Sequence, residues 1–366
     1  MRKVIFILIS SFLGLAGILI FLEIVFRFLP VYSFLEVQPL DQAHPILHYA
    51  PGRTFTVSER WDLEQVNRGR INNEGFVNDQ DYHADAKTPL LAVIGDSFVE
   101  GLYVPYQETL QGRLAAHTER NWRVYSFGIS GTALSQHLIS AEYVRDKYHP
   151  RALAMIIVLN DFDQSLFIYG KDPGHYVFKD DKHGSFTIER INFHPSVWRN
   201  MLRYSALARY LIFNLRVTAW RELISSGSTA DRYVLHPDTA GEPERVANSK
   251  KAVDFFLTKL PEMSGLGSDH VAFIVDGLRP SLYDDKSVTA AAKATFPGVL
   301  RQYFIDAALK NGFSVIDMQQ IFTDRHQADG SRFEFSRNYH WNSLAYQVVT
   351  EALTASDWFE RLWKDK

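Results

Sequence analysis

The sequence contains no cysteine, and this absence removes several classes of site at once. It excludes disulfide bonds, thiolate metal ligands, a cysteine nucleophile and a lipidated amino-terminal cysteine. An excess of positive charge is also missing, because 39 Lys and Arg face 42 Asp and Glu for a formal net charge of -3. The chain therefore carries no basic footprint for nucleic acid. Internal repeats, low-complexity tracts and recognised metal-ligand motifs are absent too, so we expect neither a metal nor another cofactor.

The amino-terminal stretch is the longest run without charge. Arg2 and Lys3 precede it, and the 19 residues from Val4 to Leu22 are mostly apolar. As a helix they rise roughly 28 Å, close to the ~30 Å hydrocarbon core of a bilayer. Basic residues before the span favour a cytoplasmic amino end, so residues 1–27 are expected to form a cytoplasmic tip and a single-pass anchor in the inner membrane. The remaining chain then lies in the periplasm. A cleaved signal peptide is the alternative, although no convincing small-x-small site follows.

Five segments of strand length recur between helical patterns in the rest of the chain. Tyr106 to His117 and Leu134 to Tyr148 have helical spacing. The apolar content of the strands is typical of a parallel sheet covered on both faces. We therefore predict a three-layer α/β sandwich of flavodoxin-like type with a parallel five-stranded sheet, behind the transmembrane helix. Its strands are expected over Leu90–Ile94, Arg123–Phe127, Ala152–Leu159, Val271–Val275 and Phe313–Ile316.

Two regions depart from this alternation. Residues 28–88 are turn-rich and are interpreted as a connector and accessory segment with a short strand pair against the main domain. Within the main domain, residues 89–366, a stretch at about 165–245 breaks the rhythm and is read as an insertion. Aromatic, leucine and arginine residues from Ser196 to Leu223 have helical spacing, and a polar loop follows. We expect a helical hairpin packed on the core; a lid over the crevice and a surface resting on the membrane are the alternatives.

Polar segments follow three of the expected strands directly. Because parallel strands end at one edge of the sheet, these segments are expected to face one crevice. A serine at such a strand end can act as a nucleophile if a base reaches it, and His340 lies in the strand-to-helix segment near the carboxyl end. The nucleophile elbow of α/β-hydrolases is excluded, since position 99 is Val99 rather than glycine. The segments are Gly95-Asp96-Ser97-Phe98, Phe127-Gly128-Ile129-Ser130-Gly131, Val158-Leu159-Asn160-Asp161 and, before the last helix, Asn338-Tyr339-His340-Trp341-Asn342.

The ordered serine, glycine, asparagine and histidine of these four blocks resemble the SGNH (GDSL-type) hydrolase and acyltransferase superfamily. The resemblance covers Leu90 to about Leu353, interrupted by the insertion. It implies that Ser97 is the nucleophile and His340 the general base. It also implies an oxyanion hole made by the amides of Ser97 and Gly131 and by the side-chain amide of Asn160. A glycine amide can approach the oxyanion closely, and each such donor is worth roughly 3 to 4 kcal/mol.

One position departs from the family pattern. The family places an aspartate two or three residues before the histidine, where this chain has Asn338 and Arg337. The carbonyl oxygen of Asn338 can accept the proton on Nδ1 of the imidazole, which makes Asn338 the third catalytic candidate. A backbone carbonyl in that place is another route. Asp317 and Asp324 are candidates for the missing carboxylate, although neither spacing supports them.

The other polar residues of the blocks have simpler interpretations. Asp96 and Asp161 are expected to hold the turns at the strand ends rather than to do chemistry. Asn160 has the alternative role of capping the helix that follows its strand.

The resemblance and the anchor together imply an extracytoplasmic serine esterase or O-acyltransferase. Its substrates would be O-acyl, above all O-acetyl, esters of carbohydrate or small esters, handled through an acyl-serine intermediate. Anchored members of the superfamily also imply a possible partner, a membrane-bound O-acyltransferase. The alternative is a catalytically degenerate SGNH-fold protein that binds glycan or scaffolds a polysaccharide-modifying complex.

Overall fold

A five-stranded parallel sheet lies at the centre of the main body of the chain. The computed structural model describes residues 2–119, 121–181, 184–193, 197–217, 243–279, 281–284, 286–336 and 338–364. The strand order β4-β3-β5-β8-β9 is 2-1-3-4-5 in order of appearance along the chain, which is the flavodoxin-like order. All four neighbouring pairs are parallel, as predicted. The strands are β3 (Leu90–Gly95), β4 (Arg123–Gly128), β5 (Ala152–Ile157), β8 (Val271–Val275) and β9 (Ser314–Asp317).

Successive side chains of the central strands enter two different apolar clusters. Met155 of β5 packs into one apolar cluster and Ile156 into the other. The cluster of Met155 is formed with α4 (Leu134–Tyr148), α10 (Pro243–Ser264) and α12 (Phe296–Lys310). The cluster of Ile156 is formed with α3 (Leu110–His117), α13 (Met318–Asp329), α14 (Ser343–Thr354) and α15 (Asp357–Lys364). Strands buried on both faces need apolar residues at every position, and β3, β5 and β8 have them. The predicted three-layer sandwich is therefore confirmed.

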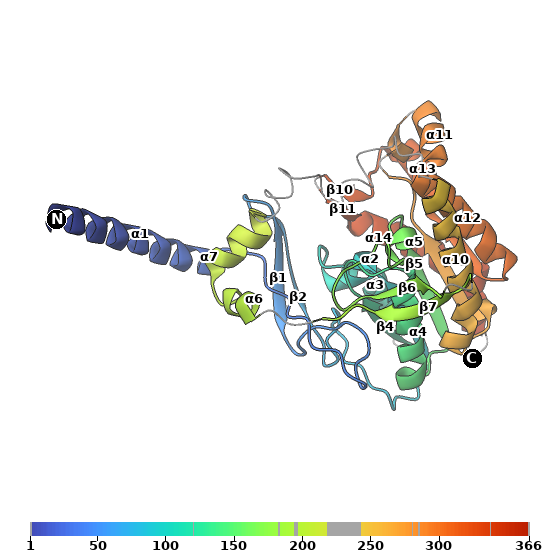
Figure 1. Ribbon diagram of the computed structural model, residues 1–366. Coiled ribbons are helices and arrows are strands. Elements are labelled where there is room, and N and C mark those ends of the chain that lie inside the picture. Colours follow the sequence, from blue (N-terminus) through green and yellow to red (C-terminus); the bar gives the residue numbers. More distant parts are fainter. Residues whose placement is uncertain are drawn as a thin grey trace.

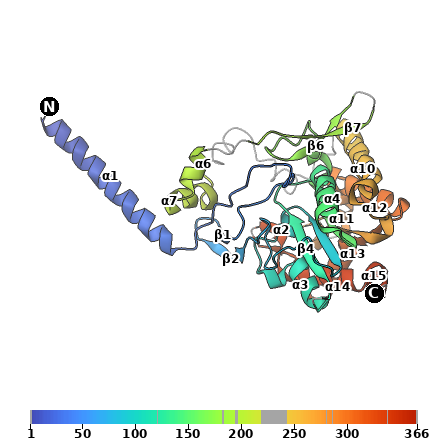
Figure 2. The same ribbon diagram turned by 90° about the horizontal axis from the view of Figure 1, so that it is seen from below.

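The two helical layers account for most of the remaining main domain (Figures 1 and 2). The first contains α4 (Leu134–Tyr148), α10 (Pro243–Ser264) and α12 (Phe296–Lys310), with α11 (Lys286–Ala294) beside α12. The second contains α3 (Leu110–His117), α13 (Met318–Asp329), α14 (Ser343–Thr354) and α15 (Asp357–Lys364). The helix expected from Tyr106 begins as a 3-10 turn, and α3 starts only at Leu110, where the Thr109 hydroxyl caps it by accepting from the Gly112 amide.

The accessory segment contains the expected strand pair, β1 (Thr54–Glu59) and β2 (Glu64–Arg70). Phe55 and Val57 of β1 form a third apolar cluster that includes Leu102 and Ile129 of the main domain. The side chain of Asn67 donates to the carbonyls of Leu102 and Val104, at 2.8 and 2.7 Å. The hairpin is therefore fixed against the loops that follow β3 and β4.

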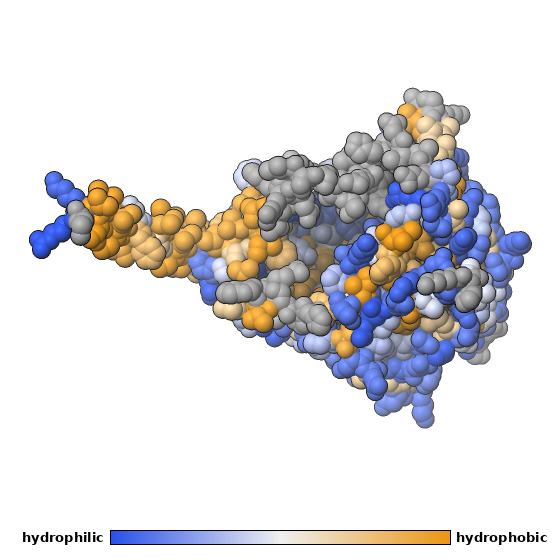
Figure 3. Space-filling view, viewed as in Figure 1, coloured by the Kyte–Doolittle hydropathy of each residue, from blue (hydrophilic) through white to orange (hydrophobic). Residues whose placement is uncertain are grey.

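Helix α1 (Arg2–Phe28) extends away from the body as an isolated apolar rod (Figures 1 and 3). Its 27 residues are long and apolar enough to cross a membrane, and none of the apolar window is buried against the rest of the chain. At about 40 Å the helix exceeds the ~30 Å hydrocarbon core. Length and composition make α1 a candidate membrane span.

The insertion differs from its expected form. Its described part contains a β-hairpin, β6 (Tyr176–Asp180) with β7 (Phe186–Arg190), then α6 (Val197–Leu202), α7 (Ala206–Arg209) and a π-helical turn over Tyr210–Asn214. The polar loop and the end of the expected helical stretch lie outside the described residues.

The expected helical hairpin on the core is wrong for this described part, because α7 packs against the end of α1 (Figure 1). The carboxylate of Glu23 in α1 accepts from the amides of Ala206 and Leu207, both at 3.0 Å, so α1 caps this helix. The rings of Phe26 and Tyr210 stack with centroids 4.1 Å apart. Tyr210 of the insertion thus contacts α1, whereas Phe178 and Phe186 pack in the apolar cluster on the sheet.

The short helix α2 (Ser97–Glu100) closely approaches the end of β4, and this contact leads to a stability prediction. A Cβ on Gly128 would lie 2.4 Å from the backbone nitrogen of Glu100, so Gly128→Ala forces backbone to move. We expect a loss of about 1–3 kcal/mol of unfolding free energy, measured by denaturant titration of the full chain in detergent. Gly267→Ala is the matched control, since its Cβ would meet only the flexible carboxylate of Asp269. Equal stability of the two variants would contradict the prediction.

Candidate active site

Ser97 is presented at the carboxyl end of β3 by a sharp strand-to-helix turn. The strand ends at Gly95, and the short helix α2 (Ser97–Glu100) begins two residues later. The Asp96 carboxylate caps this helix by accepting from the amide of Phe98 at 3.0 Å. The Ser97 side chain is left half-buried at the edge of the sheet.

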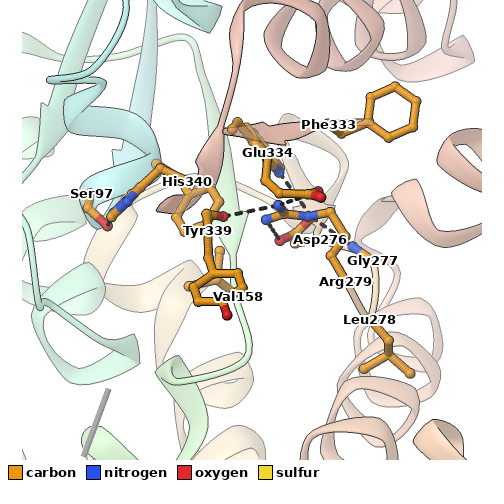
Figure 4. Close-up of polar contacts among 12 residues, drawn as sticks. Ser97, Val158, Asp276, Gly277, Leu278, Arg279, Phe333, Glu334, Tyr339 and His340 are labelled. Carbon is orange, nitrogen blue, oxygen red and sulfur yellow. Dashed lines mark hydrogen bonds and ion pairs between the residues drawn. The ribbon is translucent and has the colours of Figure 1, made fainter. Parts of the chain in front are cut away.

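His340 comes from the opposite end of the sequence and meets this serine. It lies in β11 (Asn338–Trp341), which pairs with the two-residue strand β10 (Glu334–Phe335) just before α14. Its Nε2 is 2.8 Å from Ser97 Oγ, although 243 residues separate them in the chain. Figure 4 shows the two side chains pointing toward each other. The structure therefore brings together the nucleophile and the base that the sequence proposed.

A buried arginine fixes the strand that carries His340 (Figure 4). Arg279 donates to the Tyr339 carbonyl at 3.0 Å and to the Asp276 carboxylate at 2.6 Å. Asp276 also accepts from the indole N–H of Trp341 at 3.0 Å. Because Tyr339 and Trp341 flank His340, this charged network determines where the imidazole lies. Glu334 provides a second carboxylate to the arginine, so its buried charge is compensated.

Two aromatic rings enclose the imidazole. The ring centroids of Phe98 and Tyr103 lie 5.2 and 4.8 Å from that of His340. Burial lowers the pKa of His340 to about 4, with smaller contributions from the positive charges of Arg279 and Arg216. The imidazole is therefore neutral, and able to accept the serine proton, over the whole neutral range.

Asn338 contacts the other nitrogen of the imidazole. Its Oδ1 lies 2.5 Å from His340 Nδ1 and also accepts from the backbone N–H of His340 at 3.0 Å. Its Nδ2 donates to Oε1 of Glu59 at 2.7 Å. Asn338 thus occupies the geometric position of a third triad member, while its catalytic role stays a prediction. Arg337 lies outside the described residues.

Sequence reasoning missed Glu59, the carboxylate that accepts from Asn338 at the end of the line formed by Ser97, His340 and Asn338. The two carboxylates that it considered lie elsewhere: Asp317 caps α13 and pairs with Arg301, and Asp324 accepts from Gln320 at 2.6 Å. The absence of an aspartate before His340 was the one available signal. Glu59 is 279 residues away from Asn338 in the chain, so its position depends on tertiary packing alone.

The residues expected in the oxyanion hole follow neighbouring strands at the same edge of the sheet. Gly131 has φ +80°, a left-handed conformation that favours glycine. Its loop is tied to α2, because Glu100 accepts from the hydroxyls of Ser130 and Tyr49. Asn160 stands at the N-cap position of α5 (Asp161–Gln164), but its side chain makes no capping hydrogen bond, so the alternative capping role is not seen.

The side-chain amide of Asn160 is already partly engaged. It donates to Oε1 of Gln164 at 3.0 Å, which takes one of its two hydrogens. Oxyanion binding by Asn160, Gly131 and Ser97 stays a prediction.

Two buried carboxyls, Asp96 and Asp161, lie in the turns after β3 and β5. Oδ2 of Asp161 accepts from the amide of Val158 at 2.8 Å and closes the turn after β5, as the capping contact of Asp96 closes the turn after β3. The predicted turn-holding contacts of Asp96 and Asp161 are confirmed. Burial raises the pKa of both carboxyls, that of Asp96 to about 7. Within the described ranges, no cluster of three or more His, Asp or Glu side chains is arranged to hold a metal ion.

Comparisons with known proteins give distant similarities. No family model matches the chain, and no curated protein matches it. Among solved structures it is similar to a member of the lipolytic protein G-D-S-L family from Veillonella parvula, with 11% identity, TM-score 0.36, and coverage of 73% of this chain and 97% of that one. It is also similar to a lipase/acylhydrolase from Enterococcus faecalis, with 12% identity, TM-score 0.39, and coverage of 75% of this chain and 96% of that one. For an acetyl xylan esterase the identity is 10% and the TM-score 0.37, with coverage of 72% of this chain and 97% of that one.

The low pKa of His340 predicts an unusual pH profile. Protonation removes the base, so the reaction rate of Ser97 with a neutral fluorophosphonate should stay level on acidification to about pH 5 and fall near pH 4. Asn338→Asp places a negative charge beside Nδ1, stabilises the imidazolium and moves this acid limb to higher pH. Rate constants measured from pH 4 to 8 test both statements. A wild-type midpoint at the ordinary histidine pKa of 6.5 would contradict the lowered pKa of His340.

Proposed function

We propose that this chain is a membrane-anchored serine esterase that works through an acyl-Ser97 intermediate. The observation that carries the proposal is the continuous hydrogen-bonded line from Ser97 through His340 to Asn338. A serine hydroxyl is a weak nucleophile until a base accepts its proton, and the imidazole nitrogen 2.8 Å away supplies that base.

The acylation step follows from these contacts. Ser97 Oγ forms a bond to the ester carbonyl carbon while its proton moves to Nε2 of His340. The resulting tetrahedral intermediate collapses when the carbon–oxygen bond to the leaving alcohol breaks, and His340 returns the proton to that alcohol. The carbonyl of Asn338 accepts from Nδ1–H throughout, so the imidazole keeps its orientation.

Deacylation repeats the sequence with water as nucleophile. His340 takes a proton from the water that attacks the acyl carbon, and then protonates Ser97 Oγ as the acid leaves. In both steps the negative oxygen is assigned to the amides of Ser97 and Gly131 and the side chain of Asn160. A donor aimed at that oxygen acts only as charge develops, which is why it accelerates the reaction.

The proposed setting is the periplasmic face of the inner membrane, with α1 as anchor and the basic Arg2 and Lys3 on the cytoplasmic side. O-acyl, chiefly O-acetyl, esters of carbohydrate are the proposed substrates. Tyr339, adjacent to His340 and 41% exposed, offers an aromatic face of the kind that packs on a sugar ring. In this setting a membrane-bound O-acyltransferase would be a partner that passes acyl groups to Ser97.

Ester hydrolysis and transfer to a carbohydrate hydroxyl differ only in which acceptor attacks acyl-Ser97. Acetyl-ester turnover is therefore measured with and without an added sugar acceptor. Hydrolysis at full rate without acceptor supports the esterase and contradicts the transferase.

Covalent labelling tests the proposed nucleophile. The full chain in detergent should react with a fluorophosphonate probe, and Ser97→Ala should lower labelling and ester turnover on the order of 10³-fold or more. Ser185→Ala, an exposed serine in the β6–β7 turn, is the matched control and should label like the wild type. A folded wild type that neither labels nor turns over esters would contradict the proposal and favour the glycan-binding or scaffolding alternative.

A further inference from the structure

The amide of Asn338 is held at both ends, and the far end is held by the accessory hairpin. Oδ1 of Asn338 faces His340, and Nδ2 faces the carboxylate of Glu59. On the basis of the proposed esterase chemistry, we propose that Glu59 is a positioning residue that orients the Asn338 amide and, through it, selects the working tautomer of His340.

The direction of each hydrogen bond supports this role. An ionised carboxylate only accepts, so the Asn338 group that faces Glu59 must be the NH₂ group. The carbonyl oxygen then points at His340 Nδ1, and this contact requires the proton to be on Nδ1. Nε2 is left with a free lone pair, which faces the hydroxyl of Ser97. A reversed amide would place NH₂ against Nδ1 and favour the tautomer that cannot take the serine proton.

Charge is the second contribution of Glu59. The imidazolium formed during the reaction needs a nearby negative group, and neutral Asn338 cannot provide one. Glu59 is one amide away from the imidazole, and a chain of hydrogen bonds inside a protein polarises cooperatively. Glu59 does not touch the reacting atoms, so its effect passes through Asn338.

Burial raises the pKa of Glu59, and its polar surroundings oppose this rise in part. Desolvation raises its pKa, and this effect is opposed by the charges of Arg216 and Arg60 and by hydrogen bonds from the Tyr103 hydroxyl and Asn338. The register of the hairpin shifts between Val57 and Glu59, because β2 has one residue more than β1 in this interval. Beyond the shift Glu59 pairs with Glu64 of β2, and Ser58 and Glu59 are both buried.

The anchor-proximal segment holds this part of β1 in place. Asn214 is buried, and its Nδ2 donates to both the carbonyl and the hydroxyl of Ser58 at 3.0 Å. Its Oδ1 accepts from the amide of Tyr32 at 3.1 Å. Asn214 ends the helical turns that begin at the helix capped by Glu23 of α1. The His340 strand lacks a carboxylate of its own, and Glu59 of β1 supplies one. The segments that hold β1 here, around Tyr32 and Asn214, lie next to the candidate membrane span.

A merely structural role for Glu59 predicts different behaviour, and a double-mutant cycle separates the two roles. The full chain is compared in detergent as wild type, Glu59→Gln, Asn338→Asp and the double variant. Glu64→Gln, an exposed acid paired with Glu59 in the neighbouring strand, is the matched control and should keep wild-type kcat.

Glu59→Gln should lower kcat for an acetyl ester on the order of 10- to 100-fold with little change in KM, because the amide loses its fixed orientation. In the Asn338→Asp background the same substitution should leave kcat unchanged or raise it. The carboxylate introduced by Asn338→Asp would contact the imidazole directly, and Glu59 beside it would be a repelling like charge. The disappearance or reversal of the loss of kcat in the Asn338→Asp background is the signature of a residue that acts through Asn338.

The outcomes separate failure of this proposal from failure of the proposed function. An equal loss of kcat from Glu59→Gln in both backgrounds, or no loss in the wild-type background, overturns the positioning role. An inactive, unlabelled wild type overturns the esterase instead. In that event the ¹⁵N shifts of His340 still decide, because the Nδ1–H tautomer should lose population in Glu59→Gln, and an unchanged spectrum would contradict the positioning role.

Discussion

The hydrogen bond between Ser97 Oγ and His340 Nε2 is the interaction on which the rest of this molecule's chemistry depends. It joins the end of the first sheet strand to a short strand 243 residues later. The central sheet does not place His340, since among the described strands β11 pairs with β10 alone. Placement comes from Arg279, whose contacts to Asp276 and the Tyr339 carbonyl fix the backbone around the histidine. Burying the charge of Arg279 costs free energy, and in return its contacts fix the position of His340.

The site is also where three regions of the chain meet. The main domain contributes Ser97 and His340, the accessory hairpin contributes Glu59, and Asn214 of the insertion holds the strand that carries Glu59. The insertion in turn rests on the end of α1 through Glu23. The accessory segment and the insertion are thus both linked to the edge of the sheet where Ser97 and His340 meet. The candidate membrane span is linked to the same edge through its contact with the insertion.

The sequence predicted the parts of the fold that depend on local pattern. Apolar runs such as Ala152–Leu159 located the buried strands, although this strand ends at Ile157, and Leu134–Tyr148 was predicted at the helix bounds that the structure has. The same reasoning proposed Ser97, His340 and Asn338, which lie in contact. It could not find Glu59, because a residue that meets Asn338 only through tertiary packing, 279 residues away in the chain, leaves no periodic signal. It also misplaced the helices of the insertion, since their aromatic residues suit the core and the anchor equally well.

The most direct test of this account is a crystal structure of the protein after reaction with a fluorophosphonate, which leaves a stable tetrahedral adduct. If Ser97 is the nucleophile, phosphorus is bonded to Ser97 Oγ. Its phosphoryl oxygen then lies within hydrogen-bond distance of the Ser97 and Gly131 amides and the Asn160 side chain. An adduct on another residue, or a phosphoryl oxygen directed away from these three donors, would contradict it.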